Sequence, residues 1–129
     1  MARGKRPVVA IGEAKRRAIA WGFALIEMVI EAGTPVDFAF HDNGRISFVW
    51  VRRLKYNAYR VETVRVSCAQ EIREFRELAL PEGIDRELWV RGMNREWHRY
   101  RIVPDTIEEV KDVLQTGLLT AGTGTQGGK

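Results

Sequence analysis

Apolar positions in the first third of the chain predict a helix followed by a β-hairpin. Residues 13–32 carry apolar side chains on nearly every side, which predicts one long, buried helix. Gly33 stands at the usual C-terminal glycine position of that helix. Residues 36–41 then alternate between apolar and polar or small side chains, as a strand does, and residues 46–53 form the returning strand. Asn43-Gly44 favours a two-residue turn, since both turn positions need positive φ.

The second half of the chain predicts a helix, a hairpin and a final helix. Ser67-x-x-Gln70 has the spacing of a capping box and predicts a helix over residues 68–80. Residues 87–92 and 97–103 predict a second hairpin, whose register the sequence leaves open. A second capping pattern, "DTIE", predicts a last helix over residues 105–114.

The order helix, hairpin, helix, hairpin, helix predicts an α/β fold with a central mixed sheet flanked by helices. Residues 12–116 form the single domain that we expect. Residues 1–11 are basic and aperiodic, which predicts a flexible arm. The Gly/Thr-rich residues 117–129 predict a disordered tail, and residues 54–66 receive no assignment.

The cysteine content and hydropathy indicate in which cellular compartment we expect the protein. The chain has one cysteine, Cys68, which excludes an internal disulfide and favours a reducing, cytoplasmic location. The longest apolar run of the first predicted helix, residues 18–26, is too short to cross a bilayer. We therefore expect no membrane partner.

Charge is unevenly distributed along the chain. Residues 1–17 and 45–65 each carry a net charge of +5, whereas residues 66–85 and 104–116 each carry −3. Such segregation suits a polyanionic partner on one side of the molecule, and an ordinary mixed solvated surface is the alternative interpretation.

The predicted hairpin places a carboxylate in an unusual position. With a two-residue turn, Asp42 pairs with Arg45, and Asp37 then faces Trp50 across the strands. Arg52 lies one step further along the same face. A carboxylate, an indole and a guanidinium should therefore meet at the end of the hairpin away from the turn.

This arrangement resembles the PD-(D/E)XK nuclease superfamily, which includes restriction endonucleases and archaeal Holliday-junction resolvases. In that pattern a helix with a glutamate precedes a hairpin, whose strands carry an aspartate and then (Asp/Glu)-x-Lys. "PVD" at 35–37 is similar to the Pro-Asp element with one residue inserted, and "VWVRR" at 49–53 is similar to the second-strand motif. The resemblance spans residues 13–112 and implies a restriction-endonuclease-like fold.

The resemblance implies a catalytic site that is incomplete in this chain. Asp37 matches the aspartate that would hold Mg²⁺ or Mn²⁺, and Glu13 matches the helical glutamate. Trp50 stands where the second carboxylate belongs, and Arg52 stands where the lysine belongs. An indole offers no acceptor for a hard cation, and arginine stays protonated at neutral pH. We therefore expect weak or absent nuclease activity.

Two other carboxylates and two basic segments complete the candidate residues. Glu62 or Glu71 could replace the missing carboxylate, although each also suits an ordinary surface. A basic run interleaved with tyrosine follows the second strand and suits phosphate contact or simple coverage of the sheet by the side-chain stems. The resulting candidates for nucleic-acid binding are Arg16, Arg17, Arg52, Arg53, Lys55 and Tyr56. An Arg/Trp face at residues 97–101 suits contact with a nucleic-acid backbone or structural packing, and packing is the favoured interpretation.

Three functions follow from these patterns. The first is nucleic-acid binding, with DNA as the expected polymer, on a nuclease-like fold with an eroded metal centre and no cofactor. The second is an active endonuclease that uses Mg²⁺ or Mn²⁺ and a migrated carboxylate. The third is a structural or assembly module that does not bind nucleic acid, with Trp50 in its core or interface. Related nucleases often dimerise, so a homodimer is a further expectation.

Overall fold

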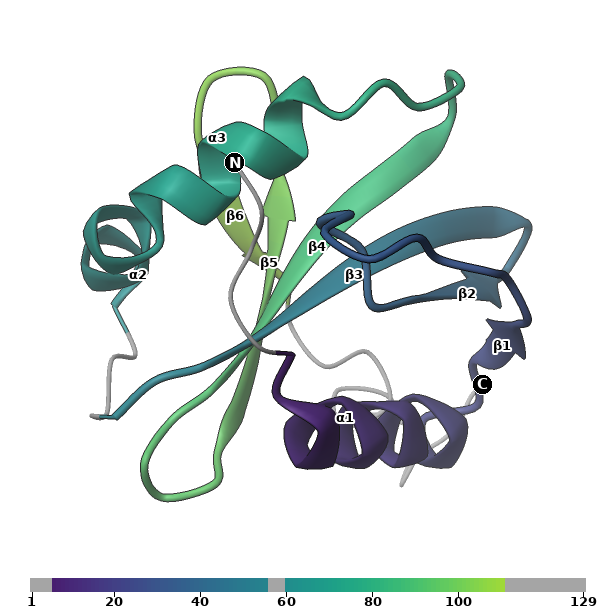
Figure 1. Ribbon diagram of the computed structural model, residues 1–129, viewed down its shortest axis with the longest axis horizontal. Helices are drawn as coiled ribbons and strands as arrows, with labels where there is room; N and C mark the ends of the chain where they lie inside the picture. The colour runs from purple at the N-terminus through teal and green to yellow at the C-terminus, as the bar shows by residue number, and fades with distance from the viewer. Residues whose placement is uncertain (1–5, 56–59, 111–129) are drawn as a thin grey trace, which may run out of the picture.

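The computed structural model describes residues 6–55 and 60–110, which form a mixed α/β fold. Six strands form one sheet in the order β1 to β6, and three helices cover its two faces (Figure 1). Neighbouring strands are antiparallel except for the parallel pair β3–β4. The elements, in chain order, are α1 (Val8–Ala20), β1 (Ala24–Ile26), β2 (Phe38–Asp42), β3 (Arg45–Arg53), α2 (Val61–Ser67), α3 (Ala69–Glu77), β4 (Ile84–Arg91), β5 (Trp97–Ile102) and β6 (Ile107–Val110).

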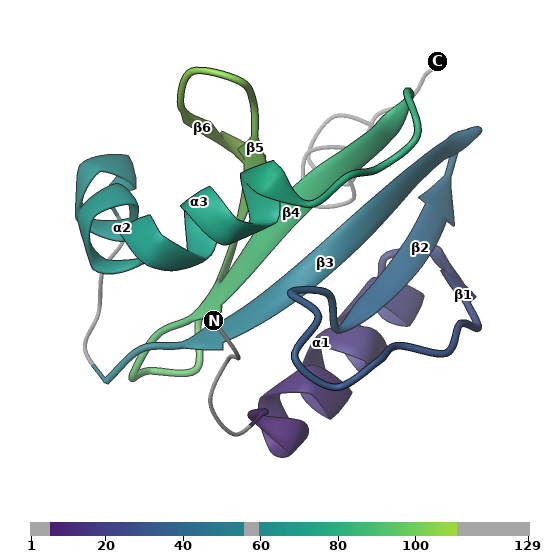
Figure 2. The same ribbon diagram turned by 45° about the horizontal axis from the view of Figure 1, so that its top comes forward.

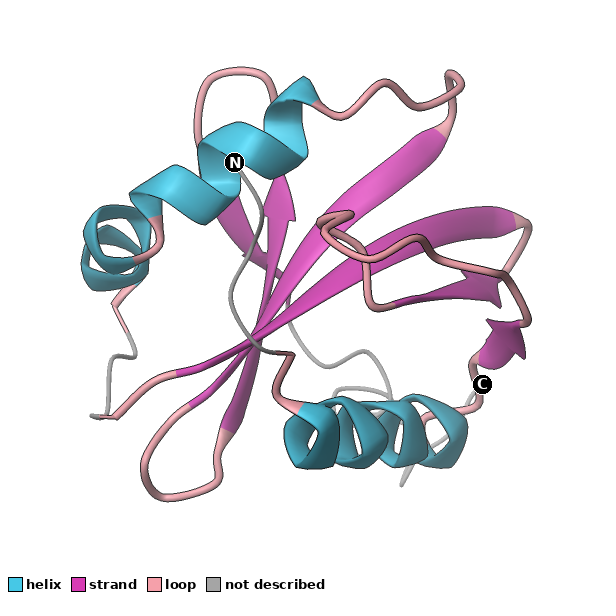
Figure 3. Ribbon diagram, in the orientation of Figure 1, coloured by secondary structure: helices cyan, strands magenta, loops and turns pink. Residues whose placement is uncertain are grey.

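The two helical layers lie on opposite faces of the sheet. Helix α1 packs on one face, while α2 and α3, which connect the parallel strands β3 and β4, pack on the other (Figures 1 and 2). A hydrophobic core fills each interface. Figure 3 shows how the sheet passes between the helices as one twisted layer. The middle residues of β3 and β4 therefore point alternately into one of the two cores, whereas Arg45 and Arg53 at the two ends of β3 are exposed.

Helix α1 approaches the sheet closely because its inner face is made of alanine. Ala10, Ala14 and Ala18 follow the i, i+4 spacing and are fully buried. The helix ends at Ala20, and Gly22 just beyond it has a φ of +89°, as the left-handed residue of a Schellman motif requires. There Phe23 N–H donates to the Ala18 carbonyl at 2.9 Å.

The prediction of a helix over residues 13–32 is therefore wrong at both ends. The helix begins at Val8, so residues 8–11 belong to it rather than to an arm, and β1 follows Gly22. An apolar stretch on every side suits a buried strand as well as a buried helix. Gly33, the predicted end of the helix, instead has a φ of +88° in the loop before β2.

The β2–β3 hairpin confirms the sequence prediction of turn and register. Asn43 and Gly44 have φ of 52° and 80°, as a type I′ turn requires. Asp42 pairs with Arg45 and Phe38 with Val49. The expected alternation fails only at the start of the first strand, which begins at Phe38 rather than at residue 36.

Helices α2 and α3 correct the prediction of one helix over residues 68–80. Ser67 is the last residue of α2, and Cys68 joins it to α3, which has no side-chain cap. The capping-box spacing therefore lies across a helix–helix junction. Residues 61–66, which the sequence left unassigned, belong to α2.

The second predicted hairpin is confirmed as β4 and β5, with Arg91 opposite Trp97. The last predicted helix, over residues 105–114, is wrong because residues 107–110 form strand β6 against β5. Pro104 and Asp105 occupy the tight connection, closed by a 3.1 Å hydrogen bond from Val103 N–H to the Thr106 carbonyl. The Asp-x-x-Glu pattern therefore lies at a strand-to-strand turn. The predicted tail over residues 117–129 lies outside the described residues.

Candidate nucleic-acid interface

Asp37 is a structural carboxylate at the point where β2 begins. Its N–H donates to the Val49 carbonyl at 2.7 Å, and its Oδ2 accepts from Val51 N–H at 2.7 Å. The carboxylate thus replaces a backbone carbonyl and extends the β2–β3 ladder by one hydrogen bond. The side chain is fully buried, and Arg6 Nη1 lies 3.6 Å from Oδ1.

The chain crosses from one face of the sheet to the other at Asp37. Val36 packs in the core under α2 and α3, whereas Phe38 packs in the core under α1. In a regular strand these two residues would share a face. Turning the Asp37 carboxylate into the ladder accompanies this crossing. The prediction that Asp37 and Trp50 face each other on one side of a regular hairpin is therefore wrong.

Trp50 belongs to the hydrophobic core rather than to a polar site. It is 3% exposed, and its ring meets Phe75 of α3 edge to face, with centroids 6.0 Å apart. Val64, Leu88 and other apolar residues share that core. The position that the resemblance assigns to a second carboxylate is therefore covered by α2 and α3.

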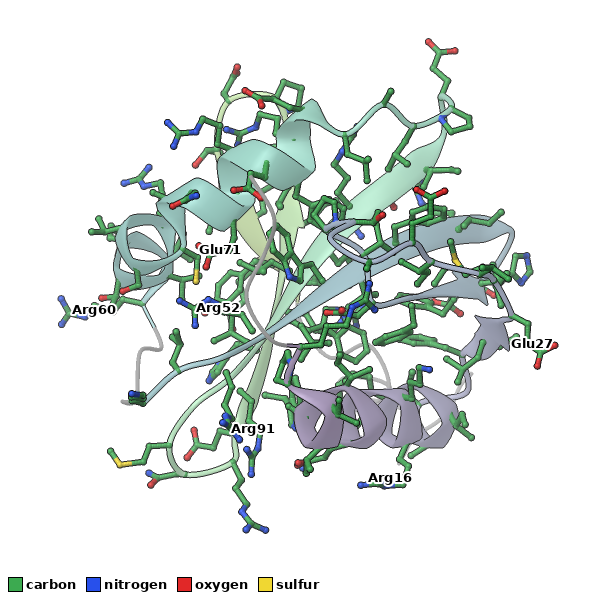
Figure 4. The ribbon with its side chains drawn as sticks, viewed as in Figure 1. Arg16, Glu27, Arg52, Arg60, Glu71 and Arg91 are labelled. Carbon is green, nitrogen blue, oxygen red and sulfur yellow. The ribbon has the colours of Figure 1, made fainter. Side chains whose placement is uncertain are left out.

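Arg52 lies on the same side of the sheet and is held by Glu71 of α3. Arg52 Nε donates to Glu71 Oε2 at 2.7 Å, and Arg52 Nη1 donates to the Arg53 carbonyl at 3.0 Å. Both side chains keep contact with solvent, with 36% and 22% of their area exposed. Figure 4 shows the two side chains together between β3 and the α2–α3 layer.

Cys68 lies buried near this ion pair. Burial raises the pKa of its thiol to about 11, the nearby Arg52 charge lowers the pKa, and the Glu71 charge raises it. At neutral pH the thiol therefore keeps its proton and behaves as a small apolar core group.

Glu13, the candidate helical glutamate, lies on the α1 side of the sheet. Its Oε2 accepts from Trp97 Nε1 at 3.1 Å, and its Oε1 lies 3.3 Å from Arg91 Nε. Glu13 thus attaches α1 to the β4–β5 hairpin, whereas Trp50 and Arg52 face the other helical layer.

These donors do not fit a magnesium or manganese site of the kind that the resemblance implies. Asp37 Oδ2 accepts a hydrogen bond from Val51 N–H, and Asp37 Oδ1 lies beside the Arg6 guanidinium. Glu13 is engaged by Arg91 and Trp97. A hard divalent cation needs several converging oxygen ligands, and these two carboxylates are already bound to protein donors. Within residues 6–55 and 60–110, no three His, Cys, Asp or Glu side chains gather as a metal would require.

Several predicted binding residues meet at one end of the sheet instead. We call the exposed cations Arg53, Lys55, Arg60 and Arg95 the basic end. Strands β3 and β4 finish there side by side and β5 begins there, because Arg53 pairs with Arg91 and Arg91 pairs with Trp97. Arg60 directly precedes α2 on the same side of the molecule, and Figure 4 shows its side chain pointing outward, away from Arg52.

Acidic side chains of the described residues do not neutralise the exposed cations of the basic end. None of the four forms an ion pair with another described residue. Arg6 lines a hollow of about 410 Å³ together with Arg53 and the first turn of α1, but its guanidinium is already paired with Asp37, with Nη1 3.6 Å from Oδ1. Glu62 and Glu96 are exposed acids at the same end, so its charge is moderate rather than extreme.

The opposite end of the sheet also carries arginines, but these are bound to protein acceptors. We call Arg45, Arg86 and Arg101 the paired end. Arg45 holds Asp85 through two nitrogens, at 3.1 Å and 2.8 Å. Arg86 donates to the carbonyls of Phe75 and Leu78 at the end of α3, and Arg101 Nε lies 3.7 Å from Asp85.

The remaining predicted binding residues are dispersed. Arg16 and Arg17 are exposed on α1, and Figure 4 shows Arg16 on the side of the helix that points away from the sheet. They lie on the opposite helical layer from Arg52. Tyr56 lies outside the described residues.

The Arg/Trp face predicted at residues 97–101 contributes Arg99 to a buried ionic cluster. Arg99 and Glu87 face each other under α1, with nitrogen–oxygen distances of 3.0 Å and 3.2 Å and side chains 7% and 1% exposed. Trp89 Nε1 also donates to Glu87, at 2.9 Å. The guanidinium carbon lies 5.1–5.8 Å from the ring centroids of Trp21, Phe23, Phe40 and Trp89. The cluster is structural, because aromatic rings enclose it.

Comparisons with known proteins give no family name for this arrangement. No family model matches the chain, and no curated protein matches it. Among the described residues, no helix has the length and apolar character needed to span a membrane.

Proposed function

We propose that this protein binds nucleic acid through its basic end and does not cut it. The observation that carries the proposal is the difference between the two ends of the sheet. The four cations of the basic end are exposed and have no acidic partners among the described residues. Phosphate groups are bound by such side chains, which supply charge and hydrogen-bond donors together.

The order of elements supports a restriction-endonuclease-like fold for this binding module. Helix α1 precedes the β2–β3 hairpin, Asp37 stands at the start of the first hairpin strand, and a helical connection leads from β3 to the parallel strand β4. We infer that the module is related to PD-(D/E)XK nucleases and that its metal centre is eroded. Asp37 and Glu13 then serve the fold, through their contacts with Val51 and Arg91.

Binding through the exposed cations of the basic end predicts modest affinity and a strong effect of salt. Contacts with phosphates give dissociation constants of about 1–100 µM near physiological salt when no bases are read. The logarithm of the affinity for duplex DNA should fall linearly with the logarithm of the salt concentration. A flat salt dependence would contradict phosphate contact.

The test is a titration of a labelled DNA duplex and a labelled four-way junction, followed by fluorescence anisotropy from about 50 mM to about 200 mM salt. Arg53→Glu should weaken binding by about tenfold or more, because a cation is lost and an anion is placed at the interface. Arg73→Glu is the matched control, since Arg73 is exposed on α3 and the change in charge is identical. Equal effects of the two variants would show that only net charge matters. A folded wild-type protein that binds neither DNA would overturn the proposal.

A further inference from the structure

The Arg52–Glu71 ion pair lies beside the basic end, where it affects the proposed interface. Arg52 lies near the end of β3, next to Arg53, and Glu71 contacts Arg52 from α3. The 2.7 Å contact from Arg52 Nε to Glu71 Oε2 places the carboxylate directly against the guanidinium. The pair therefore hides one cation of a surface whose neighbouring cations are exposed.

The position of this pair suggests a role other than stabilising the fold. An ion pair that remains in contact with water adds little to folding stability. Arg52 and Glu71 are 36% and 22% exposed, in contrast to the enclosed pair of Arg99 and Glu87. Water can therefore solvate the Glu71 carboxylate if Arg52 turns to another anion.

We propose that Glu71 is an internal competitor for phosphate, so that a nucleic-acid phosphate must displace its carboxylate to reach Arg52. This inference rests on the proposed function. A guanidinium makes similar charge-assisted hydrogen bonds to a carboxylate and to a phosphate, which permits the exchange. While the pair is closed, the carboxylate cancels the charge of Arg52 and repels an approaching phosphodiester.

The experiment compares Glu71→Gln with Glu74→Gln. Glu74 lies one turn further along α3, accepts a 3.1 Å hydrogen bond from Gln70 and forms no ion pair among the described residues. Both variants lose one negative charge from the same helix. Only Glu71→Gln removes the carboxylate that faces Arg52, so it should bind the duplex about two- to fivefold more tightly than Glu74→Gln. The slope of log affinity against log salt should steepen by about one counterion.

A double-mutant cycle assigns the gain to Arg52. In an Arg52→Ala background, the affinity advantage of Glu71→Gln over Glu74→Gln should shrink, because there is no guanidinium to release. Glu71→Asp keeps the charge but shortens the side chain, so its affinity should lie between those of wild type and Glu71→Gln. Urea unfolding of each variant establishes that the proteins compared are folded.

The outcomes separate this inference from the proposed function. Equal affinities of Glu71→Gln and Glu74→Gln, with wild type binding, would overturn the competitor role and leave nucleic-acid binding intact. Weaker binding by Glu71→Gln would overturn it too, by showing that Glu71 holds Arg52 in position for phosphate. Absence of binding by every folded variant would overturn both proposals.

Discussion

At the basic end, Arg53 and Arg95 extend into solvent, whereas at the paired end Arg45 and Arg86 are each bound through two nitrogens to protein acceptors. Both ends belong to the same two parallel strands, β3 and β4. The paired end joins the starts of these strands to each other and to α3. The basic end also carries arginines, but within the described residues its exposed arginines do not connect β3 and β4 to each other or to a helix.

The contrast shows that arginine content alone does not identify a binding surface. The sequence has more basic than acidic residues, with a net charge of +4, yet many of its cations satisfy backbone carbonyls or buried carboxylates. What distinguishes the basic end is the availability of its donors.

The arginine most committed to the fold is Arg99, so breaking its pair should have the largest effect. Glu87→Gln removes the only carboxylate within hydrogen-bonding distance of Arg99 among the described residues, and leaves a cation 7% exposed. The free energy of unfolding should fall by about 3–5 kcal/mol, because a buried charge loses its partner. Urea denaturation measures the loss. The apolar double variant Glu87→Leu/Arg99→Met should regain much of the lost free energy of unfolding. If it does not, altered packing rather than an unpaired charge causes the loss.

Asp37→Ala should also destabilise the fold, which separates a structural carboxylate from a catalytic one. The substitution leaves the buried Val51 N–H without its acceptor and removes the anion beside Arg6. We expect a loss of about 2–4 kcal/mol in the free energy of unfolding. Cleavage assays with Mn²⁺ on linear and four-way-branched DNA should show none for wild type or variant. Cleavage that disappears with Asp37 would support the active endonuclease.

The hairpin and its register could be predicted because their cause is local. Asn43-Gly44 selects one turn, and that turn fixes the pairing of β2 with β3. The end of α1 was missed although Gly22 is also a local signal. The apolar residues on both sides of Gly22 fit a buried helix and a buried strand equally well.

The candidate site was less predictable because its contacts depend on tertiary packing. Nothing near Asp37 in the sequence shows that its side chain turns into the ladder, since this follows from Val36 and Phe38 entering different cores. Glu71 was named only as a substitute ligand. Its contact with Arg52 depends on how α3 crosses β3.

The pH dependence of stability should reveal the environment beside the Arg52–Glu71 pair. Burial raises the pKa of Cys68 to about 11, above the usual value of 9.0. Below pH 9.0 the thiol is protonated in both states and its contribution is fully present. That contribution falls as pH rises toward 11, because the unfolded chain releases the proton first.

The expected loss in the free energy of unfolding is roughly 2–3 kcal/mol across this alkaline window. Tyr100 contributes in the same direction at higher pH, since burial also raises its pKa. Urea unfolding at several pH values should therefore show a shallower decline in Cys68→Ala than in wild type. Identical slopes would mean that the thiol is not buried as described.

The smallest effects belong to Arg45→Ala and Arg53→Ala, which compare the two ends directly. Arg45→Ala removes an ion pair whose arginine is 64% exposed and should lower the free energy of unfolding by about 0.5–1 kcal/mol, with little change in DNA affinity. Arg53→Ala should leave stability within about 0.5 kcal/mol of wild type and weaken DNA binding by about threefold, since one phosphate contact is lost. Urea denaturation and anisotropy titrations on the same preparations measure both quantities. If Arg45→Ala weakened binding as much as Arg53→Ala, pairing with Asp85 would not keep a cation from DNA, and the distinction between the two ends would fail.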